Sequence, residues 1–140
     1  MPEQAQALNP ETVLKRYYEA MNQGQAEDAY ALFAANAIRR ERFQSAPDNV
    51  VTDPTHIKAG ITARGKDNIV IEAWDFQVDG NKVTCMAKVW TDYGRKAGFA
   101  PVEERVEVIV DSYGKIKDYA VMVTPESLAR MEAAEQTIDG

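Results

Sequence analysis

Apolar positions recur at helical spacing in the first half of the chain. The segment from Val13 to Met21 has apolar residues three and four apart, which predicts a helix. Asn9-Pro10 and Asp53-Pro54 each place a capping side chain before a proline, which is typical of a helix start. With a last helix after Thr124-Pro125, the predicted helices cover residues 10–22, 25–34, 54–64 and 124–134.

Alternating or continuous apolar runs predict strands in the rest of the chain. Asp79-Gly80 between two of these runs is a hairpin signal. Residues 45–52 and 93–101 are expected to be loops. The predicted strands cover residues 37–44, 69–78, 82–92, 102–110 and 115–123.

The order of the elements indicates an α+β fold, because the helices are segregated from an antiparallel meander. We expect three N-terminal helices to pack on one face of a curved antiparallel sheet, with a C-terminal helix added. This arrangement leaves a cone whose open end can hold a ligand. The length of 140 residues fits a single domain, residues 1–140.

Composition narrows the classes of partner and cofactor. A net charge of -6 and a pI near 4.8 disfavour nucleic acid, and no apolar run is long enough to span a bilayer. Cys85 is the only cysteine, and the N-terminus has no signal-peptide pattern, so we expect a cytoplasmic protein. With one cysteine, one histidine (His56) and no glycine-rich phosphate loop, we expect no metal and no nucleotide cofactor.

The segment AIRRERF, residues 37–43, carries charge on both faces of a predicted strand. Its alternation puts Arg39, Glu41 and Phe43 on one face and Arg40 and Arg42 on the other. Two interpretations of the first face remain open. Arg39 forms a closed ion pair with Glu41, or it leaves Glu41 free for a ligand and itself binds a carboxylate through its fork of donors.

Several motifs carry a resemblance to a known family: Arg16-Tyr17, Asn22-x-Gly24, Leu32-Phe33-Ala34 with Ala37, VDGNKV and YGKIKDY. With the order of elements, they make the chain similar to the nuclear transport factor 2-like superfamily, in particular its SnoaL-like group, over residues 10–135. The family includes isomerases, cyclases, dehydratases, epoxide hydrolases and non-catalytic binding domains. The resemblance therefore implies the fold more strongly than the function.

Ketosteroid isomerase is the member that resembles the first third of the chain most. The comparison implies that Tyr17 donates a hydrogen bond to a substrate oxygen and that Glu41 is the general base. The place of the protonated aspartic acid falls at about Val106, which cannot donate. SnoaL-like cyclases need one carboxylic acid in an apolar pocket, and this sequence meets that requirement. Arg39 would be the electrostatic orienter, so the predicted catalytic residues are Glu41, Tyr17 and Arg39.

The predicted pocket walls come mainly from bulky residues at even-numbered strand positions. An aromatic and methionine-rich face more often forms the hydrophobic core, but in a cone-shaped fold the same face forms both the core and the wall of a ligand pocket. Glu72 shares the face of Trp74 and is a second candidate acid. The predicted substrate-binding residues are Phe43, Trp74, Met86, Trp90, Val106, Met122 and Ile61.

These patterns together predict a protein that binds a small hydrophobic molecule and performs cofactor-free isomerase, cyclase or dehydratase chemistry. The alternative is a non-catalytic ligand-binding or dimerisation domain. The resemblance also implies a homodimer formed through the outer face of the sheet, where Glu103, Arg105 and Glu107 alternate with inward valines.

Overall fold

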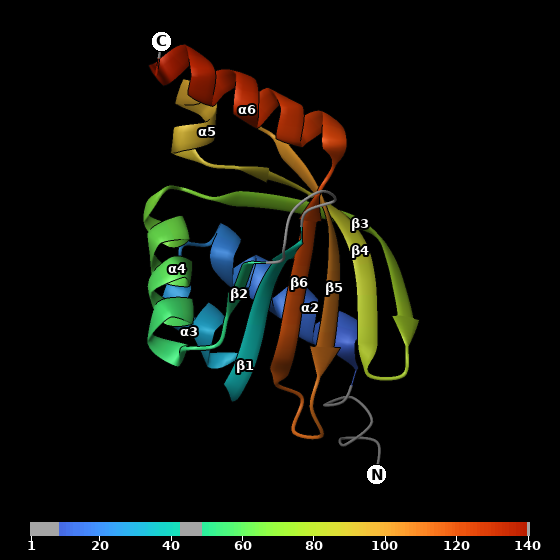
Figure 1. Ribbon diagram of the computed structural model, residues 1–140. Coiled ribbons are helices and arrows are strands. Elements are labelled where there is room, and N and C mark those ends of the chain that lie inside the picture. The colour runs from blue at the N-terminus through green and yellow to red at the C-terminus, as the bar shows by residue number, and fades with distance from the viewer. Residues whose placement is uncertain (1–8, 43–48, 140) are drawn as a thin grey trace.

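A computed structural model describes residues 9–42 and 49–139 and contains one curved, open sheet with helices on one face and at one end (Figure 1). The elements in chain order are α2 (Pro10–Asn22), α3 (Ala26–Ala31), β1 (Phe33–Arg42), β2 (Asn49–Val51), α4 (Pro54–Lys66), β3 (Val70–Asp79), β4 (Lys82–Trp90), α5 (Asp92–Ala97), β5 (Val102–Val110), β6 (Ile116–Val123) and α6 (Pro125–Asp139).

The six strands lie in the order β2-β1-β6-β5-β4-β3. Helices α2, α3 and α4 cover one face, whereas α5 and α6 lie together at one end of the sheet (Figure 1). The predicted α+β class is therefore confirmed. The sheet is mixed rather than wholly antiparallel, because β1 pairs in parallel with β6 while every other pair is antiparallel.

Three parts of the chain differ in secondary structure from the sequence prediction, beyond shifts in the ends of other elements. The second helix ends at Ala31 and β1 begins at Phe33, where Ile116 N–H donates to the carbonyl of Leu32 at 2.8 Å. Residues 49–51 form the short edge strand β2, and residues 92–97 form α5. Helix α5 is polar, so no apolar period reveals it. Its start depends on the Thr91 hydroxyl, which accepts from Gly94 N–H at 3.0 Å.

The sheet face that packs against the helices carries small apolar residues. On β4 these are Val83, Cys85 and Ala87, and on β5 the buried positions begin at Val106. Small side chains fit here because α2 fills the space with large ones, such as Tyr17 and other buried residues of its apolar stripe. The core is therefore filled by large side chains from α2 packed against small side chains from the sheet.

The bulky even-numbered positions lie on the opposite, outer face, which corrects the predicted pocket wall. Met86 pairs with Trp74 and Arg105 across the sheet, and Met122 pairs with Arg105. Trp74 is 38% exposed. Phe76 does not share the face of Trp74, since an irregularity at Asp75, with φ 61°, reverses the alternation, and Phe76 packs on the core.

Side-chain hydrogen bonds fix two helices to the sheet. The Asn22 amide at the end of α2 accepts from Ile71 N–H at 2.6 Å and donates to the Ile71 carbonyl at 2.9 Å, on the free edge of β3. The buried Ser127 hydroxyl of α6 accepts from Glu103 N–H at 2.9 Å. Helix α6 is thereby held at the start of β5. No helix in the described part of the chain is long and apolar enough to cross a membrane.

Candidate functional site

A cavity of about 240 Å³ lies between the inner face of the sheet and the helices. Its wall is mainly aliphatic and comes from β3, β4, β5 and β6. Phe99, which follows α5, and Met131 of α6 also line it, so the end layer contributes to its closure. The aliphatic residues of the sheet side are Ile69, Ile71, Val89, Val102, Val121 and Val123.

Polar groups meet at one part of this apolar wall. Arg39 of β1 lies opposite Tyr119 of β6 in the sheet, and its guanidinium lies 4.8 Å from the centroid of the Tyr119 ring. Tyr17 of α2 contacts the same ring, with 5.4 Å between centroids. The Nε and Nη1 atoms of Arg39 are buried and have no hydrogen-bond partner among the described residues. Arg39 thus brings unpaired donors to the cavity.

Glu41 pairs with Arg64 of α4, with 3.9 Å between Oε1 and Nη2. The Glu41 side chain is 42% exposed, so this is a partly solvated contact. Burial, and then the neighbouring Arg39, lowers the pKa of Arg64, which nevertheless stays protonated. Gly60 leaves room for this guanidinium, because a Cβ at position 60 would lie 3.3 Å from Arg64 Nη1.

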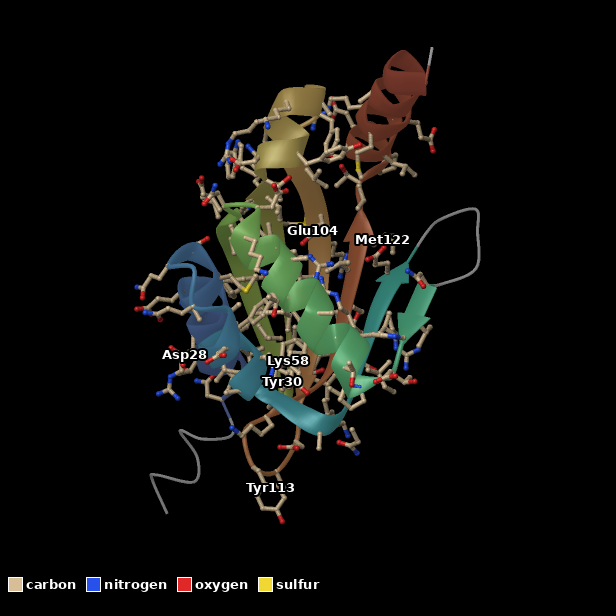
Figure 2. All side chains as sticks on the ribbon, turned by 90° about the vertical axis from the view of Figure 1, so that its left-hand side faces the viewer. Asp28, Tyr30, Lys58, Glu104, Tyr113 and Met122 are labelled. Carbon is tan, nitrogen blue, oxygen red and sulfur yellow. The ribbon has the colours of Figure 1, made fainter. Side chains whose placement is uncertain are left out.

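Glu104 of β5 is the most perturbed carboxyl group of the cavity. Figure 2 shows it between α4 and the layer formed by α5 and α6. The pKa of Glu104 is raised to about 7, chiefly by burial; Arg39 and Arg64 oppose the rise, and Glu41 adds to it. No hydrogen bond or ion pair joins its carboxyl group to another described side chain. A carboxylic acid that titrates near neutral pH can both accept and donate a proton under physiological conditions.

Two aromatic hydroxyls complete the polar surroundings. Burial raises the pKa of Tyr119 well above its usual value, with Tyr17 and Glu104 adding to the rise. Tyr119 therefore remains a neutral phenol, which can donate a hydrogen bond. Tyr18 lies deeper, with its hydroxyl 3.7 Å from the sulfur of the buried Cys85, and burial also raises its pKa. Tyr18 lines a different hollow, so the cavity combines the hydroxyl groups of Tyr17 and Tyr119, two guanidinium groups and two carboxyl groups.

The sequence prediction missed Glu104, Arg64 and Tyr119. Glu104 has the parity of Val102 and Val106, so strand alternation alone already places it on the inner face. Arg64 follows Ile57 and Ile61 at helical spacing and continues the buried stripe of α4. The sequence alone can therefore indicate both residues, because a charged residue that shares the spacing of buried apolar residues is expected to face the interior.

The predicted site residues divide into three groups. Tyr17, Arg39 and Glu41 line the cavity together. Ile61 and Val106 are fully buried core residues outside the cavity wall. Val106 was expected at the place of a proton donor, but the carboxyl group that this strand places in the cavity is that of Glu104, two residues earlier on the same face. Phe43 lies outside the described residues, and the remaining predicted wall residues lie on the outer face: Trp74, Met86, Trp90 and Met122.

Two further candidates from the sequence lie away from this cavity. Glu72 is exposed on the outer side of β3. His56 lines a separate pocket of about 80 Å³, which shares Arg39, Glu41 and Arg64 with the main cavity. Arg39, Glu41 and Arg64 therefore lie between the main cavity and this smaller pocket. Among the described residues, no group of histidine, cysteine, aspartate and glutamate side chains could hold a metal ion.

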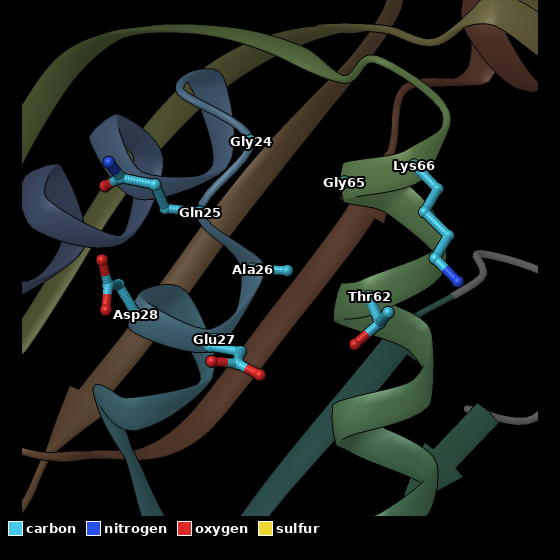
Figure 3. Close-up of a pocket in the computed structure, with 8 residues that line it drawn as sticks. All are labelled: Gly24, Gln25, Ala26, Glu27, Asp28, Thr62, Gly65 and Lys66. Carbon is cyan, nitrogen blue, oxygen red and sulfur yellow. The ribbon is translucent and has the colours of Figure 1, made fainter.

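A larger hollow of about 450 Å³ lies between the turn after α2, α3 and α4 (Figure 3). Its lining includes Glu27, Asp28, Thr62 and Lys66, and it is more open to solvent than the cavity beside Glu104. Gly65 allows the close approach here, since a Cβ at that position would lie 3.3 Å from the Ala26 Cβ. We regard it as a surface groove between helices rather than the site, because it gathers no buried titratable group.

Comparison with known proteins identifies the fold. Among solved structures, an NTF2-like protein of unknown function from Cytophaga hutchinsonii matches with a TM-score of 0.65 and 11% identity, over 86% of this chain and 94% of that chain. The protein has a nuclear transport factor 2-like fold. No family model matches the sequence, and no curated protein matches it.

Two enzyme-related structures share this nuclear transport factor 2-like fold. A putative polyketide cyclase from Sinorhizobium meliloti matches with a TM-score of 0.62 and 20% identity, over 79% of this chain and 93% of that chain. An epoxide hydrolase/cyclase-like enzyme of pyran ring formation in the polyether salinomycin matches with a TM-score of 0.67 and 15% identity, over 84% of this chain and 92% of that chain. At these identities the likeness concerns the fold alone.

Proposed function

We propose that the cavity binds a small, mainly apolar molecule and moves a proton on it without a cofactor, as an isomerase or cyclase does. The observation that carries the proposal is Glu104, a carboxyl group with a pKa of about 7 in a largely aliphatic cavity. Such a group is basic enough to take a proton and acidic enough to return it near neutral pH. The cyclases among the structural neighbours support the same class of chemistry.

In the proposed step, ionised Glu104 removes a proton from the carbon next to a carbonyl group. The electron pair of the broken C–H bond forms a carbon–carbon double bond, and the carbonyl oxygen becomes an enolate oxygen. Tyr17 donates a hydrogen bond to that oxygen, and Arg39 orients the substrate. Protonated Glu104 then returns the proton to the same or another carbon, so the enzyme ends the cycle unchanged.

Glu104 is preferred to Glu41 as the proton carrier. Glu41 already has a cationic partner in Arg64 at 3.9 Å, and 42% of its side chain is exposed. Glu104 forms no ion pair among the described residues and is surrounded by protein. We therefore assign Glu41 the role of balancing the charge of Arg64, and assign proton transfer to Glu104.

The test uses cyclohexanone as a probe, because its α-protons exchange measurably with D₂O. Exchange is followed by proton NMR with the wild-type protein, with Glu104→Gln, and with Glu103→Gln as the matched control on the opposite face. We expect the wild type to accelerate exchange with an inflection near pH 7, and Glu104→Gln to lose about 100-fold or more. Glu103→Gln should retain the wild-type rate.

Two results would contradict the proposal in different ways. If Glu104→Gln exchanged as fast as the wild type, Glu104 would not carry the proton. If cyclohexanone bound to the cavity and no variant accelerated exchange, the protein would be a non-catalytic binding domain, the alternative that the family resemblance also allows. Binding is checked separately by chemical-shift changes of cavity residues.

A further inference from the structure

Arg39 is the described residue whose buried polar atoms lack partners. Its Nε and Nη1 are enclosed and have no hydrogen bond, although buried polar groups are nearly always paired. Leaving a charged donor unpaired costs free energy that a bound acceptor would recover. The Tyr17 hydroxyl hydrogen-bonds to the Arg39 guanidinium but leaves these two atoms unpaired. The two carboxylates nearby do not pair with them either, because Glu41 pairs with Arg64 and Glu104 forms no ion pair with Arg39.

The charge balance of the cluster favours a ligand with one negative charge. Arg39 and Arg64 contribute two positive charges, and Glu41 contributes one negative charge. While Glu104 is protonated, one positive charge stays uncompensated in a mostly aliphatic cavity. A single anionic group would neutralise it, whereas a doubly charged phosphate would leave an excess negative charge beside Glu41.

The volume of the cavity fits a ligand whose apolar part is about the size of a six-membered ring. An apolar cavity of about 150 Å³ is enough to bind benzene, and the cavity here has about 240 Å³. The difference leaves room for one substituent on a six-membered ring. Arg39 and Tyr17 lie at the polar part of the wall, and the aliphatic side chains of β3, β4 and β6 lie at the rest.

We propose that the molecule bound in this cavity carries one carboxylate, which accepts hydrogen bonds from the Arg39 guanidinium while the apolar body lies against the aliphatic wall. The planar guanidinium fits the two oxygens of a carboxylate, and its stacking on Tyr119 holds it in place. This inference rests on the proposed function for the location of the site. It adds the chemical class of the ligand.

The experiment compares two probes of the same shape and different charge, cyclohexanecarboxylate and cyclohexanecarboxamide. Both are titrated at about pH 6, where Glu104 is largely protonated, and dissociation constants are obtained from NMR chemical shifts. The variants are Arg39→Met, Arg39→Lys and the control Arg40→Met. Arg40 is the next residue on β1 and pairs with Asp118 at 3.3 Å, so the control removes an equal charge outside the cavity.

We expect the wild type to bind the carboxylate about tenfold or more tightly than the amide, a difference of about 1.4 kcal/mol. Arg39→Met should remove the preference and still bind the amide, and Arg39→Lys should keep a reduced preference. Arg40→Met should behave as the wild type. If Arg39→Met fails to fold, the comparison of probes on the wild type and on Arg39→Lys still decides.

Equal binding of the two probes by the wild type, or a preference that survives in Arg39→Met, would overturn the carboxylate assignment. Proton transfer to cyclohexanone would be untouched by that result. Conversely, a carboxylate preference in a protein that never exchanges the cyclohexanone protons would contradict the proposed function and support this inference. Failure of both probes to bind would overturn this inference, whereas the proposed function is decided separately by cyclohexanone binding and exchange.

Discussion

Glu41 pairs with Arg64 of α4 at 3.9 Å, and not with Arg39, its neighbour on the same face of β1. The sequence left open whether Arg39 closes on Glu41. The structure gives a different arrangement, in which a helix residue supplies the partner and Arg39 lies over the ring of Tyr119 with unpaired donors. With Tyr17 and Glu104, the polar cluster is assembled from five elements, α2, β1, α4, β5 and β6.

This pairing predicts that Glu41→Gln changes stability little and changes the titration of Glu104. The ion pair is long and both side chains are about one-third exposed or more, so we expect its loss to cost less than about 1 kcal/mol in the free energy of unfolding. Glu41 raises the pKa of Glu104, so its neutralisation should lower that pKa. Arg64→Met should raise it instead.

Urea unfolding measures the first effect, and carbon-detected NMR titration of the Glu104 carboxyl measures the second. A matched control is Glu11→Gln, which removes an exposed i,i+4 partner of Lys15 on α2. Opposite movements of the Glu104 pKa in Glu41→Gln and Arg64→Met are required. Movement in the same direction in both variants would contradict the charge network described above.

The alternation of apolar and polar positions predicted the fold, but it led to the wrong face of the sheet for the pocket wall. The period of the apolar positions gave the order of helices and strands, and the turn signal at Asp79-Gly80 gave the hairpin. Periodicity alone does not say which of two apolar faces is inside. Bulk favoured Trp74 and Met86, whereas the face that packs against α2 carries the smaller Val83, Cys85 and Ala87. The face of the sheet that becomes buried is the one whose side chains fit the volume left by the helix packed against it.

The candidate site shows a similar limit. Tyr17 and Glu41 follow from the family pattern and Arg39 from the strand alternation, and all three line one cavity. Glu104 was overlooked because its strand begins with charges on both faces, so the valine register had to be followed back from Val106 to find it. Arg64 could be placed on the buried stripe of α4 by spacing. Its pairing with Glu41 depends on how α4 crosses β1, which local sequence does not encode.

Asn22 is predicted to stabilise the attachment of α2 to the sheet. Its amide forms hydrogen bonds of 2.6 and 2.9 Å with both backbone groups of Ile71 on the edge of β3. Asn22→Ala would leave these two groups without partners, so we expect a loss of about 2–3 kcal/mol in the free energy of unfolding. Asn22→Asp keeps the acceptor and loses the donor. Its free energy of unfolding should fall between those of the wild type and Asn22→Ala.

Chemical denaturation of the three proteins tests this order. Ile71 also lines the cavity, so Asn22→Ala should weaken binding of cyclohexanecarboxamide as well. If Asn22→Ala were as stable as the wild type, these hydrogen bonds would not hold α2 to β3 in solution.

We expect the outer face of the sheet to form a homodimer, as the family resemblance implies. Val70 and Trp74, which share the outer face of β3, are 43% and 38% exposed, a large apolar exposure for one strand. Trp74→Glu should weaken self-association by about tenfold or more. Light scattering across a concentration series measures it, with Tyr113→Glu as a control at an exposed turn. A wild-type mass of 15.6 kDa at all concentrations would disprove the dimer.

The raised pKa of Glu104 predicts that this residue makes the protein less stable as the pH rises. In the unfolded chain the carboxyl group ionises near its ordinary pKa of 4.5, whereas in the folded protein it holds its proton until about pH 7. Between these values the folded state binds more protons, so each rise in pH favours unfolding. Below about pH 4.5 both states are protonated, and above about pH 7 both are ionised, so the effect is confined to that window.

The expected size follows from the distance between the two pKa values, at about 1.4 kcal/mol for each unit, or about 3 kcal/mol in all. Glu104→Gln removes the titration. Its stability relative to the wild type should therefore increase by about that amount between about pH 4.5 and about pH 8. Urea unfolding at several pH values measures the difference, and Glu103→Gln, on the outer face, should show no such trend. A constant difference between Glu104→Gln and the wild type would mean that Glu104 titrates as an ordinary carboxyl group, and the proposed proton transfer would lose its basis.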